Sequence, residues 1–168
     1  MSPDYKKSLS ARKAAYTRAI KRLEAKALHA EDDRDRAAAV AELVRRYGAL
    51  PSYAIEEALK DHSGRVRVAA IHAIGKMIEV GSDGSAKALL EMAGREDDEQ
   101  VLAHIREVLP QTRHPYAIRE IAVIARKGEG RMRQYAVDAL RTIYKRATNV
   151  INFVVSSLTD LEESDDAK

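Results

Sequence analysis

The chain has 168 residues, of which 45% are hydrophobic and 33% charged, with a formal net charge of +3. This length is sufficient for one domain with its own core, and the absence of cysteine excludes disulfides, thiolate metal sites and cysteine nucleophiles and favours a cytoplasmic, intracellular protein. The apolar runs are far shorter than the ~20 residues that span a bilayer, and no signal-peptide pattern is visible at the N-terminus.

The first predicted element is a basic helix within residues 1–30. Apolar residues recur over 9–28 at the spacing of one helix face: Leu9, Tyr16, Ile20, Leu23 and Ala27. Residues 1–30 carry eight Lys or Arg against two acidic residues, a net charge of +6. We expect this segment to cap the fold and to present a basic arm to an acidic partner. The residues of this arm are Lys13, Arg18, Lys21 and Arg22.

Helical spacing continues along the chain, and turns that contain Gly or Pro separate the segments. With the first helix, about nine helices are predicted, the others being 34–47, 52–60, 65–79, 85–93, 99–109, 115–126, 131–147 and 148–158. Pro110 ends the helix 99–109 because proline lacks the N–H that a continuing helix needs. Only Gly75, among eight glycines, falls inside a predicted helix. The acidic residues 159–168 are predicted to form a disordered tail.

The same spacing assigns the inward faces of the helices. Small residues at inward positions allow helix axes to approach closely. In 34–47 these inward positions include Ala38, Ala39, Leu43 and Val44, and in 65–79 they include Val66, Ala69, Ala70, Ala73, Ile74 and Met77. The β-branched run 150–155 is compatible with a strand in isolation, but the sequence offers no partner strand. We expect the helix 148–158, which is too apolar for a free surface, to complete the last unit or to dock on another chain.

Two stretches of the sequence return at a nearly constant interval. Residues 53–59 read YAIEEAL and return 63 residues later as YAIREIA, and Arg65-Val-Arg67 returns 66 residues later as Arg131-Met-Arg133. Each interval holds two units of about 30 residues, the period of stacked helix pairs. The repeated unit is therefore expected to be a pair of helices, each pair covering the apolar face of its neighbour.

Residues 61–75, with the sequence DHSGRVRVAAIHAIG, resemble the second helix of a HEAT-like repeat in its short, phycobilin-lyase form. The likeness lies in an acid in the turn, a Val-Arg pair, a small-small-apolar run and a closing Ile-Gly. The likeness is weaker at residues 132–140 and 36–43, and at 101–109 no Arg follows the Val. In all, the resemblance covers about residues 31–147. The resemblance implies an all-α, right-handed α-α superhelix of HEAT-like or armadillo type, with a repeat domain over 31–158.

The resemblance also implies roles for residues of the second helices, which would line a concave face. The arginine after the valine commonly bonds the turn acid and nearby backbone, which gives a structural role to Asp61, Arg67 and Arg133. Arg65 and Arg131 lie about 160° around the helix from those arginines and are free to project. The expected partner-binding residues of the concave face are Arg65, His72, Lys76, Arg131, Gln134, Arg141 and Lys145.

No catalytic or metal-binding constellation is found in the sequence. The histidines at 29, 62, 72, 104 and 114 are scattered, and none pairs with another at the i, i+4 spacing of a helical metal site. Phosphate-binding glycine loops are also lacking. The chain is similar in architecture to the DNA-alkylation repeat glycosylases, a family that relies on aromatic residues, notably Trp, but it contains no Trp and a single Phe. We therefore expect no metal, no cofactor and no enzymatic activity.

The leading interpretation is a non-enzymatic protein–protein interaction scaffold, a subunit of a larger assembly that binds through the concave face or the basic N-terminal helix. One alternative is nucleic-acid binding through the stripe 126–146, which carries seven Lys or Arg against two acidic residues. A solvated helix face, or contact with an acidic protein partner, is the favoured explanation of this stripe. A second, lower-ranked alternative is a lyase-like or cofactor-binding enzyme. The oligomeric state is left open.

Overall fold

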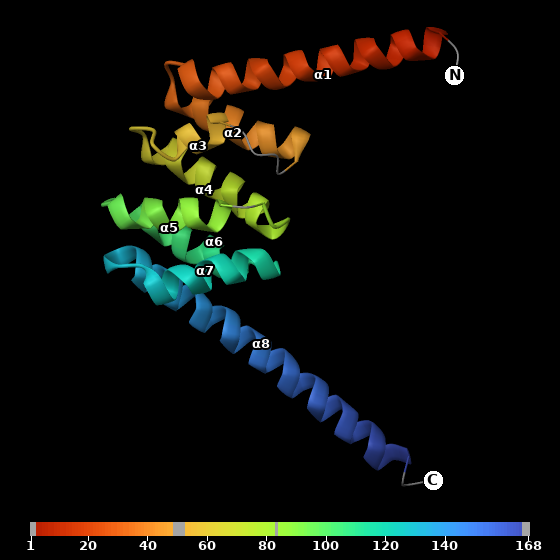
Figure 1. Ribbon diagram of the computed structural model, residues 1–168, viewed down its shortest axis with the longest axis vertical. Coiled ribbons are helices and arrows are strands. Elements are labelled where there is room, and N and C mark those ends of the chain that lie inside the picture. The colour runs from red at the N-terminus through yellow and green to blue at the C-terminus, as the bar shows by residue number, and fades with distance from the viewer. Residues whose placement is uncertain (1–2, 49–52, 83, 166–168) are drawn as a thin grey trace.

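The computed structural model describes residues 3–48, 53–82 and 84–165, and these form eight α-helices, one 3-10 helix and no strand (Figure 1). The predicted all-α fold is confirmed. The helices are α1 (Pro3–His29), α2 (Asp33–Tyr47), α3 (Tyr53–Ala58), α4 (Gly64–Glu79), α5 (Ser85–Arg95), α6 (Glu99–Val108), η1 (Leu109–Gln111), α7 (Pro115–Lys127) and α8 (Gly130–Asp165).

The helices follow one another in chain order along the long axis of the molecule (Figure 1). They form four successive pairs: α1 with α2, α3 with α4, α5 with α6, and α7 with α8. Second helices contact one another from pair to pair, α2 against α4 and α4 against α6, while among the first helices α1 contacts α3 and α5 contacts α7. This arrangement is an α-helical solenoid, with α1 at one end and α8 at the other.

Polar side chains and glycines set the helix ends where the sequence signals them. The Asp32 carboxylate accepts the N–H of Arg34 at 2.7 Å and caps α2, and the Asp98 carboxylate accepts the N–H of Gln100 at 2.9 Å and caps α6. Gly48 follows α2 with a φ of 76°, a conformation that other residues rarely adopt. These caps keep the turns between helices short, so each pair packs as a unit.

The buried faces of the helices form one continuous core. In α4, the predicted inward residues Val66, Ala70, Ala73, Ile74 and Met77 are buried, so the predicted register of that helix is correct. The register of α2 differs by one position. Ala38 is exposed, because the buried stripe of α2 runs through Arg36, Ala39, Val40 and Leu43 at i, i+3, i+4 and i+7.

The helices α4 and α6 approach each other closely at Gly75. It is buried inside α4, and a Cβ built on it would lie 2.5 Å from Cγ1 of Val108 in α6. Carbon atoms do not approach to that distance, so a residue larger than glycine fits here only if Val108 moves. The one glycine predicted inside a helix therefore has a packing reason.

The C-terminal part of the chain departs from the prediction. The helices expected at 131–147 and 148–158 form a single helix, α8, which continues through Asp165. The described residues thus hold eight α-helices instead of nine. No Gly or Pro interrupts residues 131–165, so nothing ends the helix at 148. Residues 159–165, where a disordered tail was expected, extend α8, and 166–168 lie outside the described residues.

Candidate functional site

An arginine of α2 and an arginine of α4 occupy equivalent positions 31 residues apart and make the same set of bonds. Nη1 of Arg36 donates to the carbonyls of Ala30 and Glu31 at 2.8 and 2.9 Å. Its Nε and Nη2 donate to the two carboxylate oxygens of Asp61 at 2.8 and 3.0 Å. Arg36 therefore joins its own turn to the turn of the next pair by a bidentate ion pair.

Arg67 repeats this geometry one pair later. Nη1 of Arg67 donates to the carbonyls of Asp61 and His62 at 2.9 and 3.0 Å. Its Nε and Nη2 donate to the Glu96 carboxylate at 2.7 and 3.1 Å. Together, Arg36–Asp61 and Arg67–Glu96 form a ladder of two rungs along the stack. The ladder ends at α6, where the equivalent position holds the buried Leu102.

The two carboxylates of the ladder are stabilised in their charged form. Burial raises the pKa of Asp61, but the hydrogen bonds from Arg36 and from the backbone N–H of Ser63 lower it by more. The pKa of Asp61 therefore lies below its ordinary value. The pKa of Glu96 is lowered in the same way, since burial is outweighed by Arg67 and the N–H groups of Asp98 and Asp97. Both ion pairs therefore hold at neutral pH.

The residues predicted to have structural roles bond in part to partners other than the predicted ones. Arg67 contacts the backbone of Asp61, as expected, but its acid is Glu96, and the Asp61 carboxylate belongs to Arg36. Arg133 bonds no acid among the described residues, and its Nε donates to the carbonyl of Ala125 at 3.1 Å. Sequence reasoning missed Arg36 and Glu96. The offset between Arg36 and Arg67, each followed by a run rich in small residues, is the signal that identifies the first of them.

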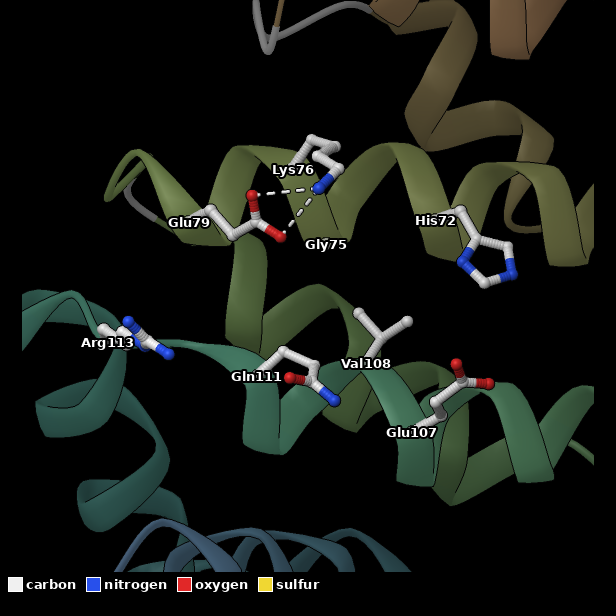
Figure 2. A pocket seen from close by; sticks show the side chains of 8 residues that line it. All are labelled: His72, Gly75, Lys76, Glu79, Glu107, Val108, Gln111 and Arg113. Carbon is white, nitrogen blue, oxygen red and sulfur yellow. Dashed lines mark hydrogen bonds and ion pairs between the residues drawn. The ribbon is translucent and has the colours of Figure 1, made fainter. Parts of the chain in front are cut away.

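A groove of about 590 Å³ opens between the second helices α4 and α6 (Figure 2). The helix α4 forms one wall, and α6 with the segment after it forms the other. The lining residues are His72, Gly75, Lys76, Glu79, Glu107, Val108, Gln111 and Arg113. Of the seven residues predicted to bind a partner, His72 and Lys76 lie in this groove.

The groove carries both signs of charge. Lys76 Nζ lies 2.9 and 3.0 Å from the two oxygens of Glu79 (Figure 2), and a Glu107 oxygen lies 3.8 Å from Nδ1 of His104. The ring of His72 meets that of His104 edge to face at 5.0 Å. Burial, and then the neighbouring His104, lower the pKa of His72. At neutral pH the His72 ring is therefore uncharged, and it lies near the Glu107 carboxylate (Figure 2).

The other predicted partner-binding residues lie in four further places. Arg65 Nε lies 3.8 Å from an Asp33 oxygen, and Arg131 Nη1 bonds the Glu96 carbonyl and lies 3.6 Å from Asp97. Gln134 and Arg141 line a separate hollow along α8, and Lys145 lines another nearer the C-terminus. The structure thus does not gather the seven residues into one site.

Much of the basic stripe 126–146 is used within the fold. Arg146 donates to the carbonyls of Pro110 and Thr112, both at 2.8 Å, and anchors α8 to the segment around η1. Arg131 and Arg133 bond backbone carbonyls, and Arg141 lies 3.3 Å from Asp138. Four of the seven basic side chains are therefore occupied, which reduces the charge available to a phosphate backbone.

The basic arm of α1 differs from this stripe. Its predicted residues Lys13, Arg18, Lys21 and Arg22 are all exposed, and none of their side chains forms a hydrogen bond or ion pair with the described residues. Within the part of the chain that the structure describes, no group of three or more His, Asp or Glu is placed to hold a metal ion. No helix there has the length and apolar character needed to cross a membrane.

The comparison with known families agrees with the regular part of the stack. The family model for HEAT repeats matches residues 20–110, which is 91 of the 168 residues and runs from within α1 to η1. No curated protein and no solved structure matches the chain. With paired, stacked helices and a family match over more than half of its length, the chain belongs to the HEAT-repeat family.

Proposed function

We propose that this protein is a non-enzymatic scaffold that docks a protein segment in the groove between α4 and α6, inside the cell and as a subunit of a larger assembly. HEAT repeats commonly mediate protein interactions, and solenoids use the extended faces of their stacked helices for binding. The observation that carries the proposal is the groove itself, which lies between neighbouring second helices and contains His72 and Lys76.

The chemistry of the groove favours a protein segment over a nucleic acid. Glu79 and Glu107 line it beside Lys76 and Arg113, so a phosphate backbone would meet carboxylates at close range. A peptide that carries both signs of charge matches this lining. Arg113 and Gln111 are exposed and have no partner among the described residues, so their hydrogen-bonding groups are free for a ligand.

The basic arm of α1 supports a second candidate function, binding to a nucleic acid or another polyanion. Its four exposed cations have no acidic partner among the described residues. Phosphate contacts release counterions, so such binding weakens steeply as salt increases. Duplex DNA and RNA that bind the chain with no change of affinity between low and moderate salt would exclude this function.

The groove is tested with a photo-crosslinking amino acid placed at position 76 of the full chain in its native cell. A matched control carries the same amino acid at Arg119, which is exposed on the first helix α7. We expect position 76 to give a discrete protein adduct that the substitution Glu107→Lys removes, and position 119 to give none. Equal labelling at both positions, or an adduct that contains nucleic acid, would contradict a protein-docking groove.

A further inference from the structure

The helix α8 leaves the stack after its first half. The last bonds that hold it to an earlier element are those of Arg146 to the carbonyls of Pro110 and Thr112. From there α8 continues to Asp165 as a straight extension that points away from the other helices (Figure 1). This projecting segment, residues 147–165, has no described helix alongside it.

Apolar residues recur along this part of α8 with alternating spacings of three and four. The positions are Tyr144, Ala147, Ile151, Val154, Leu158 and Leu161. An average spacing of 3.5 residues is that of the seam of a two-stranded coiled coil, which needs a partner helix to cover it. Where burial is described, the seam is open, since Tyr144 is 73% exposed and Ala147 is exposed.

The charges of α8 are ordered along its length. Residues 147–159 contain no charged side chain. Arg141 and Lys145 precede this neutral segment, and Asp160, Glu162, Glu163 and Asp165 follow it. A second copy of α8 that runs antiparallel sets the basic end of each helix against the acidic end of the other. A parallel copy sets like charges together, which is unfavourable.

We infer that two copies of this chain associate through an antiparallel coiled coil of their α8 helices. The heptad positions pair Ile151 with Val154 of the second copy at the centre, and then Ala147 with Leu158. They pair Tyr144 with Leu161 at each end. Arg141 then lies beside Glu162 of the second copy, twice by symmetry. The interface is isologous and closed, as in most homodimers.

This association goes beyond the docking function proposed for the groove. The groove is built from α4, α6 and the segment after α6, none of which enters the α8 pair. A dimer would carry two such grooves and could engage a partner at both. An experiment can therefore disprove the α8 dimer without disproving the docking groove, and the reverse.

The inference is tested by sedimentation equilibrium of the full chain. We expect a mass of twice the 18.7 kDa of one chain. The substitution Val154→Asp places a charge in the seam and is expected to return the mass to that of one chain. The control Ser156→Asp lies about 200° around the helix from Val154 and is expected to leave the dimer intact. Circular dichroism checks that both variants keep their helical content.

A charge exchange tests the antiparallel direction. Arg141→Glu alone and Glu162→Arg alone each create two like-charged pairs, so each is expected to lower the measured mass at the same concentration. The double variant restores opposite charges and is expected to restore the dimer, which no parallel arrangement explains. A single-chain mass for the unmodified protein would overturn the inference. So would a dimer that survives Val154→Asp, or a double variant that remains dissociated.

Discussion

The guanidinium of Arg67 donates two hydrogen bonds to the Glu96 carboxylate, at 2.7 and 3.1 Å, across the boundary between the second and third helix pairs. Both side chains are largely buried, with 16% and 9% of their surface exposed. The same guanidinium holds the turn before α4 through the carbonyls of Asp61 and His62. One side chain therefore fixes both the shape of a turn and the spacing of two pairs.

Removal of Arg67 is expected to destabilise the whole stack. Arg67→Ala leaves the buried Glu96 carboxylate without its counter-ion, and we expect a loss of about 3 kcal/mol in the free energy of unfolding. Urea denaturation measures this loss. The matched control is Lys76→Ala, which removes the exposed pair with Glu79 and is expected to cost less than about 1 kcal/mol. Equal losses in the two variants would mean that the ladder contributes nothing beyond a surface ion pair.

The ladder also predicts how stability depends on pH. The pKa values of Asp61 and Glu96 lie below their ordinary values of 3.8 and 4.5 in the folded protein. Their contribution is therefore complete above the unfolded values and is lost as the pH falls through the lowered, folded values. We expect thermal stability to decline below about pH 4.5. Asp61→Asn should be less stable at neutral pH and should lose less between about pH 5 and pH 3. An unchanged pH profile would exclude Asp61 from this role.

Substitution of Gly75 tests the close approach of α4 and α6. Gly75→Ala adds a Cβ that would lie 2.5 Å from Val108 Cγ1, and overpacking of this kind costs about 1–3 kcal/mol. Val108→Ala in the same chain removes the clash and is expected to recover part of the loss. The control Gly94→Ala has only ordinary contact with Met132, at 3.7 Å, and is expected to stabilise α5 by about 0.5–1 kcal/mol. The test is the melting temperature of the unmodified chain, of Gly75→Ala with and without Val108→Ala, and of Gly94→Ala.

Two alanines test the registers of α4 and α2. Ala70 is completely buried, so Ala70→Leu is expected to overfill the core and to reduce stability by about 1–3 kcal/mol. Ala38 is exposed on α2, and Ala38→Leu is expected to change stability by no more than about 0.5 kcal/mol. Chemical denaturation that shows the reverse order would place both helices in the wrong register.

The regular part of this fold could be predicted from sequence because each helix pair repeats its signals locally. The apolar spacing of α4 and the glycine after α2 depend on neighbouring residues, and the return of residues 53–59 at 116–122 is visible in the sequence itself. The α8 helix could not be predicted in the same way. The prediction treated the apolar residues 148–158 as a separate last helix, but the sequence around 148 contains no signal that ends a helix.

The groove was only partly predictable for a related reason. His72 and Lys76 were identified because they share a face of one helix, and that is a local property. Glu107, Gln111 and Arg113 come from the next pair, and their position opposite α4 depends on how the pairs stack. The partners of Arg67 and Asp61 were misassigned in the same way, because the bidentate contacts run between pairs and not within one.

Hydrogen–deuterium exchange of the chain, alone and with its crosslinked partner bound, tests the docking groove most directly. We predict slower exchange in the partner-bound chain over residues 72–79 of α4 and over residues 104–113, with α7 unchanged. Protection confined to α1, or no protection along α4, would contradict the assignment of the α4–α6 groove as the docking site.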